Sequence, residues 1–169
     1  IAACLAMNNT PEDLRMVMID SKMVELIRFN GLPHLYGKVE TNIERILGVL
    51  RWVVVEMEHR YRLLESAHAR DLEAYNRKVT RKADGKALPR IVVLIDELGR
   101  ATDPDEGGAL AVAVLDRVRN SGAFTLASTH LVAPKIYGAS TPGVLNGAMS
   151  FDDQTLAPTY QLRTGLPGA

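Results

Sequence analysis

The chain has 169 residues, 47% of them apolar, which is enough for one domain with a sizeable core and excludes a disordered tail. Twenty basic and twenty acidic side chains cancel, so no net field draws the chain towards nucleic acid or an anionic membrane. A single cysteine excludes an internal disulfide and suits a reducing compartment, and no apolar run approaches the roughly twenty residues that span a bilayer. We therefore expect a cytoplasmic chain with no membrane segment, folded as a single domain over residues 1–169.

The first 22 residues predict a helix end, a turn and a buried strand. Residues 1–7 are apolar, residues 8–11 form a turn, and residues 14–19 are a strand that stops at Asp20. Asp20 and the nearby Lys22 could orient the phosphates of a nucleotide or a magnesium ion, because sites of α/β proteins lie at the carboxyl ends of strands. An exposed strand-to-loop junction explains the two residues equally well.

Residues 41–64 predict one long helix, with Thr41 and Glu44 in the pattern of a capping box. Its apolar residues recur every three or four positions, as in a helix packed on a sheet. They are Ile43, Ile46, Leu47, Leu50, Val53, Val54, Met57, Tyr61 and Leu64. Trp52 lies off this stripe and either contacts a partner or covers a neighbouring loop.

A short helix is expected over residues 72–79, and basic residues follow it closely. The basic residues of this stretch are Arg77, Lys78, Arg81, Lys82, Lys86 and Arg90. They could face DNA phosphates or the nucleotide of a neighbouring subunit. A solvated linker is the alternative, because no aromatic residues interleave with them for base stacking.

Five apolar residues, 91–95, predict a strand buried on both faces, which ends at Asp96 and Glu97. An Asp in this position can hold a magnesium ion through water, and the neighbouring Glu can take a proton from an attacking water molecule. This is the Walker B pattern of phosphate-hydrolysing P-loop proteins. The alternative is a strand that ends at two solvated acids.

The residues after Glu97 predict a helix with clear ends. Asp103 is a capping residue, Pro104 occupies the first helical position, and Glu106 completes a capping box. The apolar pattern continues to Asn120, and Gly122 is placed as the stop.

Residues 123–127 predict a second buried strand, which runs into Ser128, Thr129 and His130. A strand, helix and strand of this length form a right-handed parallel unit, so we expect Asp96, Glu97 and His130 at the same edge of one sheet. His130 could then touch a γ-phosphate or the attacking water, whereas the alternative is an ordinary surface histidine.

The second half of the chain resembles a known family. The similar segments are LIDELGRATDPDEG (94–107), AFTLASTH (123–130), TPGV (141–144), LAPTYQL (156–162) and GLPG (165–168). They resemble the C-terminal half of the ATPase domain of the MutS family, closest to its Smr-associated branch, over roughly residues 91–169. The resemblance implies that Asp96 and Glu97 are the Walker B pair and that His130 is a switch histidine. It also implies that residues 102–107, which include Thr102 and Asp103, form the loop that contacts the opposing subunit.

The first half resembles a different family. The similar segments are TPEDLRMVMIDSKMVEL (10–26), GLPHL (31–35), LRWVVVEMEHRY (50–61), EAYN (73–76) and LPRIVVLIDEL (88–98). They resemble the motor domain of FtsK/SpoIIIE-type DNA translocases over roughly residues 1–98, with Ser21 where that family usually has proline. The resemblance implies a homo-oligomeric ring ATPase that binds ATP and Mg²⁺ and pumps double-stranded DNA during chromosome segregation.

Both resemblances predict an α/β fold of the P-loop NTPase type, a three-layer parallel sheet with flanking helices, followed by a hairpin of residues 147–152 and 159–164. The two parts, 1–98 and 99–169, meet at the Walker B strand that both families share. No segment of these 169 residues reads Gly-x-x-x-x-Gly-Lys-Ser/Thr, the Walker A loop that cradles phosphates. We therefore expect an incomplete sheet, whose strand at 124–128 keeps an unpaired edge unless the hairpin covers it.

Three functions remain open from the sequence. The chain is an ATP hydrolase core of the FtsK translocase type, weak or inactive alone because the Walker A loop is missing. Alternatively, it is an ATPase core of the MutS mismatch-repair type. The third alternative is a chain that keeps the fold but turns over no nucleotide.

Overall fold

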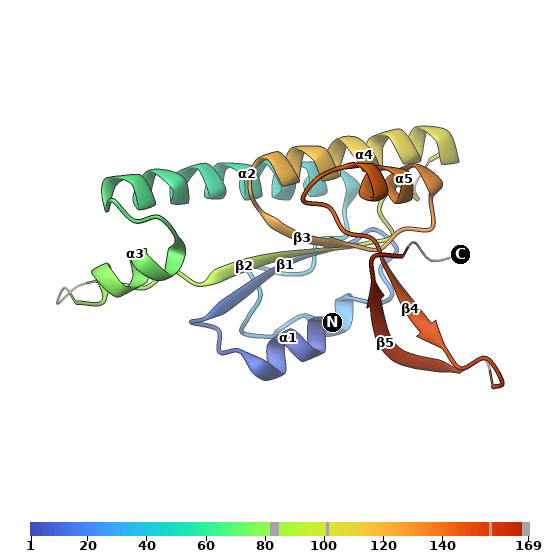
Figure 1. The fold of residues 1–169 in the computed structure, drawn as a ribbon, viewed down its shortest axis with the longest axis horizontal. Coiled ribbons are helices and arrows are strands. Elements are labelled where there is room, and N and C mark those ends of the chain that lie inside the picture. The colour runs from blue at the N-terminus through green and yellow to red at the C-terminus, as the bar shows by residue number, and fades with distance from the viewer. Residues whose placement is uncertain (82–84, 101, 156, 167–169) are drawn as a thin grey trace. The chain divides into compact units, whose positions relative to one another are not determined.

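The computed structural model describes residues 1–81, 85–100, 102–155 and 157–166 (Figure 1). These residues divide into two compact units, one of residues 1–98 and 115–129 and the other of residues 99–114 and 130–169. Lys82 of the basic stretch lies outside the described residues, as do positions 101, 156, 167 and 168 of the MutS-like segments. A single domain over the whole chain stays a prediction.

The first unit contains a parallel three-stranded sheet. Its strands are β1 (Leu14–Asp20), β2 (Arg90–Asp96) and β3 (Phe124–Ala127), in the order β1-β2-β3. β1 is in register with β2 from Leu14 opposite Arg90 to Asp20 opposite Asp96, and β3 pairs with β2 in parallel. The predicted α/β fold and the parallel arrangement of β2 and β3 are confirmed.

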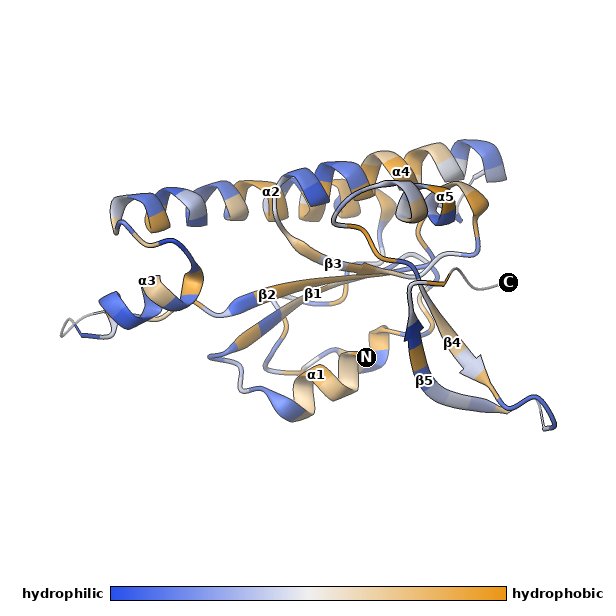
Figure 2. Cartoon of the chain, in the orientation of Figure 1, coloured by the Kyte–Doolittle hydropathy of each residue, from blue (hydrophilic) through white to orange (hydrophobic). Residues whose placement is uncertain are grey.

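The hydrophobic strands β1 and β2 are mostly buried (Figure 2). The prediction of a second buried strand is wrong for β3, where Phe124 is 65% exposed and the other residues are partly exposed, because no strand among the described residues covers its outer edge.

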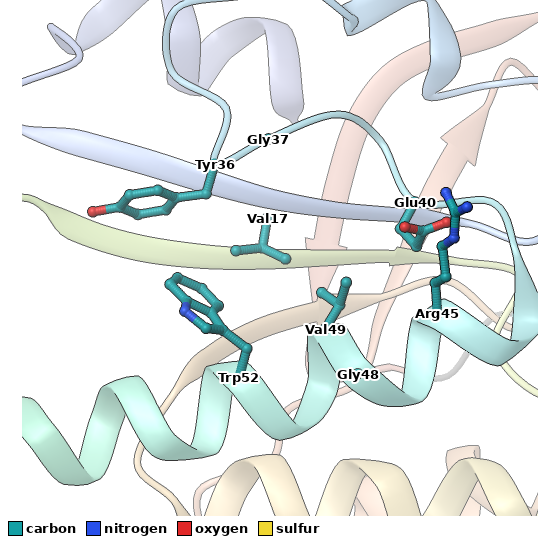
Figure 3. A pocket seen from close by; sticks show the side chains of 8 residues that line it. All are labelled: Val17, Tyr36, Gly37, Glu40, Arg45, Gly48, Val49 and Trp52. Carbon is teal, nitrogen blue, oxygen red and sulfur yellow. The ribbon is translucent and has the colours of Figure 1, made fainter.

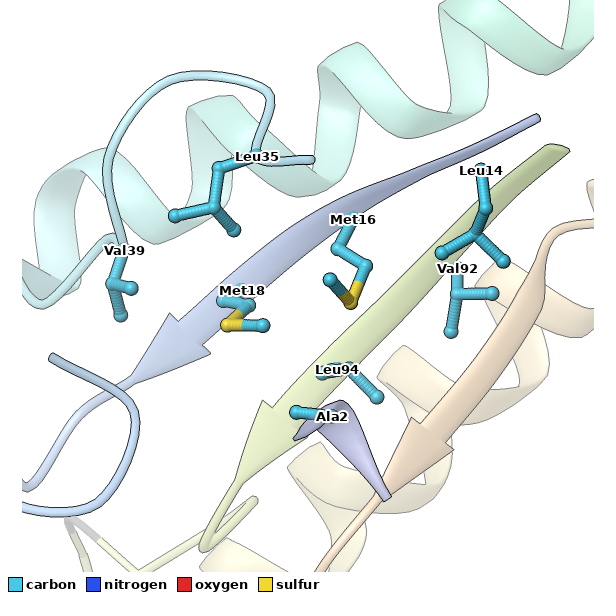
Figure 4. Close-up of a cluster of buried hydrophobic side chains, with 8 residues drawn as sticks. All are labelled: Ala2, Leu14, Met16, Met18, Leu35, Val39, Val92 and Leu94. Carbon is cyan, nitrogen blue, oxygen red and sulfur yellow. The ribbon is translucent and has the colours of Figure 1, made fainter. Parts of the chain in front are cut away.

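Helix α1 (Ala2–Asn8) lies on one face of the parallel sheet and the long helix α2 (Ile43–Ser66) on the other (Figure 1). Because successive side chains of a strand point to opposite faces, Met16 and Met18 pack on the α1 side and Val17 on the α2 side. The core on the α1 side consists of Ala2, Leu14, Met16, Met18, Leu35, Val39, Val92 and Leu94 (Figure 4).

The residue that caps helix α2 lies one position after the predicted cap. Asn42 is the capping residue, and its Oδ1 accepts hydrogen bonds from the backbone N–H groups of Glu44 and Arg45. The capping role predicted for Thr41 is therefore wrong. Two neighbouring residues can both cap a helix, and here the backbone of residues 40–42 selects Asn42, since the Glu40 carboxylate accepts the N–H groups of Thr41 and Asn42.

The buried stripe of α2 is narrower than its apolar pattern. Val53 and Val54 are buried as predicted, whereas Ile43, Leu47 and Tyr61 are exposed. Arg60 is buried instead: it forms an ion pair of 2.7 Å with Glu56 and donates a hydrogen bond to the carbonyl oxygen of Pro89. Arg60 thus links helix α2 to the segment that precedes β2.

The two edges of the sheet differ. Residues 34–40 run along the outer edge of β1 and exchange four backbone hydrogen bonds with it, through Met16, Met18 and Asp20. Among the described residues no strand pairs with the outer edge of β3, because β4 (Gly147–Phe151) and β5 (Pro158–Thr164) form an antiparallel sheet of their own. The predicted hairpin is therefore present, but it does not extend the parallel sheet.

The remaining helices are η1 (Ile27–Phe29), α3 (Leu72–Val79), α4 (Pro104–Asn120) and α5 (Val132–Ser140). Helices α3 and α4 have their predicted bounds. Helix α5 was not predicted, and its capping residue, Leu131, offers no side-chain acceptor that would mark its start in the sequence.

Part of the basic stretch serves the fold. Lys78 donates to the carbonyl oxygens of Ala67 and His68 beyond the end of α2, and Arg90 pairs with Glu73 at 2.7 Å. These two side chains therefore have partners within the chain, and any anion binding by the stretch would rest on its other members.

Candidate functional site

Polar residues gather where the three parallel strands of the first unit end. β1 ends at Asp20, β2 ends at Asp96 beside it in register, and Ser128 follows β3. The strand pairing continues past β3, since Ser128 donates its N–H to Ile95 and its carbonyl accepts from Leu98. This continued pairing places Ser128 directly beside the Walker B pair.

Ser128 connects the two acidic residues of the Walker B pattern. Its hydroxyl donates a hydrogen bond of 2.7 Å to Asp96 Oδ1 and accepts one of 2.8 Å from the backbone N–H of Glu97. The sequence analysis gave Ser128 no role, although a hydroxyl residue at the carboxyl end of the adjacent strand was a signal that could have suggested one.

The two carboxylate oxygens of Asp96 differ in their contacts. Asp96 Oδ2 is buried and has no hydrogen-bond partner among the described residues. A buried polar atom without a partner carries a desolvation cost that a bound water or cation would remove. The role of Asp96 as a water-mediated magnesium ligand stays a prediction.

Glu97 has an uncommon backbone conformation. Its φ of +51° lies in the left-handed region, which favours glycine and is costly for a residue with a side chain. Its Oε1 lies 3.4 Å from Nζ of Lys22, and both side chains are partly exposed. The structure thus brings Lys22, Asp96 and Glu97 of the predicted site into one place.

Asp20 has a different environment. Its side chain is fully buried, Oδ1 accepts the N–H of Lys22 at 3.1 Å, and Oδ2 accepts those of Val24 and Leu26 at 3.1 and 2.9 Å. These bonds hold the loop after β1 and thereby fix the backbone position of Lys22.

Thr102, Asp103 and His130 belong to the second unit. Asp103 Oδ1 accepts the N–H of Asp105 at 3.0 Å, as a capping residue of α4 does, and the Thr102 hydroxyl donates to Glu106 at 2.9 Å. A Cβ on Gly99 would lie 2.4 Å from the carbonyl oxygen of Gly107, so the loop can approach helix α4 this closely only with glycine at position 99.

His130 is exposed, and its convergence with Asp96 and Glu97 stays a prediction.

Two further searches cover only the described part of the chain. It contains no group of three or more His, Cys, Asp or Glu side chains that could hold a metal ion by themselves. None of the helices in the described ranges is both long and apolar enough to cross a membrane.

Comparison with curated proteins finds endonucleases of the MutS2 type. MutS2 of Geobacillus kaustophilus is 51% identical over 90 residues, which make up 53% of this chain and 11% of that protein. MutS2 of Levilactobacillus brevis is 33% identical over 155 residues, 89% of this chain and 18% of that protein. The chain therefore spans less than a fifth of the length of either relative.

Comparison with solved structures finds structures of ATPases. The cytoplasmic domain of the Thermomonospora curvata type VII secretion ATPase EccC matches with a TM-score of 0.54 and 23% identity, over 80% of this chain and 16% of that one. ATPases 2 and 3 of EssC from Geobacillus thermodenitrificans match with a TM-score of 0.54 and 17% identity, over 74% and 23% of the two chains. At these identities the matches show a shared fold.

The FtsK/SpoIIIE family profile matches residues 1–138. The match continues past Leu98, where the sequence analysis placed the end of the resemblance, and includes the helix α4 and strand β3. Since it takes in 138 of 169 residues, the chain belongs to the FtsK/SpoIIIE family of P-loop ATPases.

Proposed function

We propose that this chain is the Walker B side of an FtsK-type DNA translocase motor, in which Asp96 and Glu97 serve ATP hydrolysis. The observation that carries the proposal is the Ser128 hydroxyl, which bonds to the Asp96 carboxylate and to the Glu97 backbone and leaves Asp96 Oδ2 buried without a partner. A strand that merely ended in two solvated acids would not need either feature. The membership in an ATPase family supports the same assignment.

Each residue of the site has a distinct proposed part. Asp96 would hold a magnesium ion through water, and the ion, when bound, would neutralise phosphate charge. Glu97 would orient the attacking water and accept its proton, which requires a carboxylate that is ionised and within hydrogen-bonding reach.

The Lys22 ammonium group lies 3.4 Å from Glu97 Oε1. Phosphate oxygens would compete with the Glu97 carboxylate for this ammonium group. His130 would sense the γ-phosphate, and Thr102 and Asp103 would face the nucleotide of a neighbouring subunit. The roles of His130, Thr102 and Asp103 rest on the family resemblances.

Nucleotide affinity of the chain by itself is expected to be low. The residues present supply a general base and a magnesium ligand, but not the backbone N–H groups and lysine of a Walker A loop. The chain would therefore act in a cytoplasmic homo-oligomer on double-stranded DNA only where phosphate contacts come from elsewhere.

The test is a titration of a fluorescent ATP analogue into the purified chain with magnesium, with unlabelled ATP as competitor. We expect competable binding, weaker after Asp96→Asn, and a Glu97→Gln variant that retains binding but loses any turnover. Asp153→Asn, which changes an exposed carboxylate in the second unit, is the control and should change neither. Absence of competable binding up to millimolar nucleotide would refute nucleotide hydrolysis by this chain.

A second candidate is an ATPase of the MutS type, favoured by the 51% identity to MutS2 over 90 residues. The two candidates differ in assembly, since a translocase acts as a ring and a MutS-type ATPase as a pair of facing subunits. Sedimentation of the chain with ATP and double-stranded DNA distinguishes them: a ring supports the translocase, and a dimer supports the MutS type.

A further inference from the structure

A groove lies on the first unit, along the outer edge of β1. It has a volume of about 550 Å³ and runs between helix α2 and the segment of residues 34–40 that borders β1. Figure 3 shows Tyr36 and Trp52 at one end of the groove and Glu40 and Arg45 at the other. Val17, Gly37, Gly48 and Val49 line the space between them.

Gly48 is difficult to explain by the fold alone. It lies inside α2, where glycine is the least favourable residue apart from proline. A Cβ at this position would meet nothing within 4 Å, so no neighbouring element requires the absence of a side chain. Because Gly48 has no side chain, the groove beside Val49 stays open.

The aromatic end of the groove is already shaped. The ring centroids of Tyr36 and Trp52 are 5.3 Å apart, with their planes inclined by 58°, and the Arg15 guanidinium lies 5.5 Å from the Tyr36 centroid. Both rings are more than a third exposed. Tryptophan, tyrosine and arginine are the residues that contribute most to binding at protein interfaces.

The other end of the groove carries a cation without a partner. The Arg45 guanidinium makes no hydrogen bond or ion pair with any described residue. The Glu40 carboxylate does have partners, since its Oε1 accepts the N–H groups of Thr41 and Asn42. These bonds come from neutral donors and leave the Glu40 charge in place, so Glu40, Arg45 and the nearby Arg15 together carry one net positive charge.

From these features we infer that the groove binds a short acidic segment of a partner protein. An apolar side chain of the segment packs against Trp52 and Tyr36, its backbone crosses Gly48, and a carboxylate side chain pairs with Arg45. The seven residue steps from Arg45 to Trp52 correspond to about 10 Å along the helix. A segment in the polyproline II conformation rises about 3.1 Å per residue with three residues per turn, so its first and fourth side chains, the apolar and the acidic one, lie about 9 Å apart on one face.

Trp52 is the single tryptophan of the chain, so its fluorescence reports directly on the groove. The probe is a blocked tetrapeptide with leucine first, glutamate fourth and serine between, titrated into the full chain. We expect a saturable change in Trp52 fluorescence with a dissociation constant on the order of 0.1–1 mM. Replacing the glutamate of the peptide by glutamine is expected to weaken binding about tenfold, and so is Arg45→Gln in the protein.

Gly48→Leu tests the position of the peptide. Leucine favours the helix and fills the groove, so the variant should fold at least as well as the original chain and should lose binding. His59→Leu, an equally exposed position of α2 outside the groove, is the matched control and should bind normally. Circular dichroism confirms that both variants are folded.

Three results would overturn the inference. The first is a peptide that binds Gly48→Leu as well as the original chain, or that causes no change up to millimolar concentration. The second is tighter binding after the glutamate of the peptide is replaced by lysine, which would make Glu40 the recognition group. The third is a concentration-dependent change of Trp52 fluorescence without peptide, accompanied by dimers in sedimentation, which would make a second copy of the chain the occupant.

Discussion

The substitution Asp20→Asn tests the structural role of this carboxylate. Asp20 is fully buried and accepts three backbone N–H groups, one on Oδ1 and two on Oδ2. An asparagine can keep its oxygen at the Oδ2 position, but its amide group then faces the N–H of Lys22. One charge-assisted hydrogen bond is lost and two donors oppose each other in a buried place, which costs about 2–4 kcal/mol.

This loss is measured by urea unfolding followed by the fluorescence of Trp52, which belongs to the same unit as Asp20. With a slope of about 2 kcal/mol per molar urea, the midpoint should fall by about 1–2 M. Asp153→Asn, at an exposed position of the second unit, should leave the midpoint unchanged. A decrease in stability of less than about 0.5 kcal/mol for Asp20→Asn would refute the claim that the carboxylate holds the loop.

Three further predictions concern other hydrogen bonds. Ser128→Ala should lower the free energy of unfolding by about 1–2 kcal/mol in the same urea assay, and Ser128→Thr, which keeps the hydroxyl, should recover most of it. Arg60→Met should cost about 2–3 kcal/mol, because two bonds of a buried guanidinium disappear, whereas Arg62→Met at an exposed position of α2 should cost almost nothing; equal losses would contradict the tethering role. The N–H of Ala74 holds the pKa of the capping residue Asp71 below its ordinary 3.8, so its stabilisation of α3 is present above that pH and is lost as pH falls through the lower value. An NMR titration of the Asp71 carboxyl carbon with a midpoint at or above 3.8 would count against this cap.

Local signals in the sequence were enough to predict most helices and strands, but not the contacts between them. Helix α4 has its predicted bounds because Asp103, Pro104 and Gly122 mark its ends independently of the rest of the fold. At α2 two adjacent residues could cap the helix, and only the backbone around Glu40 decides between them. Helix α5 has no capping signal at all.

The site shows the same division between local and tertiary information. Asp96 and Glu97 could be placed at a strand end because an apolar run stops there. Asp20 has the same local pattern, but the loop after β1 folds back over its carboxylate, and no periodicity in the sequence encodes this. Ser128 remained without a role because the register between β2 and β3, which aligns it with Asp96, is a tertiary property.

The backbone conformation of Glu97 lowers the stability of the fold, whereas its carboxylate is needed for the proposed hydrolysis of ATP. A side chain at φ +51° costs about 1 kcal/mol or more relative to glycine, so Glu97→Gly should raise thermal stability while it removes the carboxylate. Directed evolution for heat resistance alone would therefore favour loss of this residue. A thermostable version of the chain would have to gain its stability elsewhere, with position 97 excluded from randomisation.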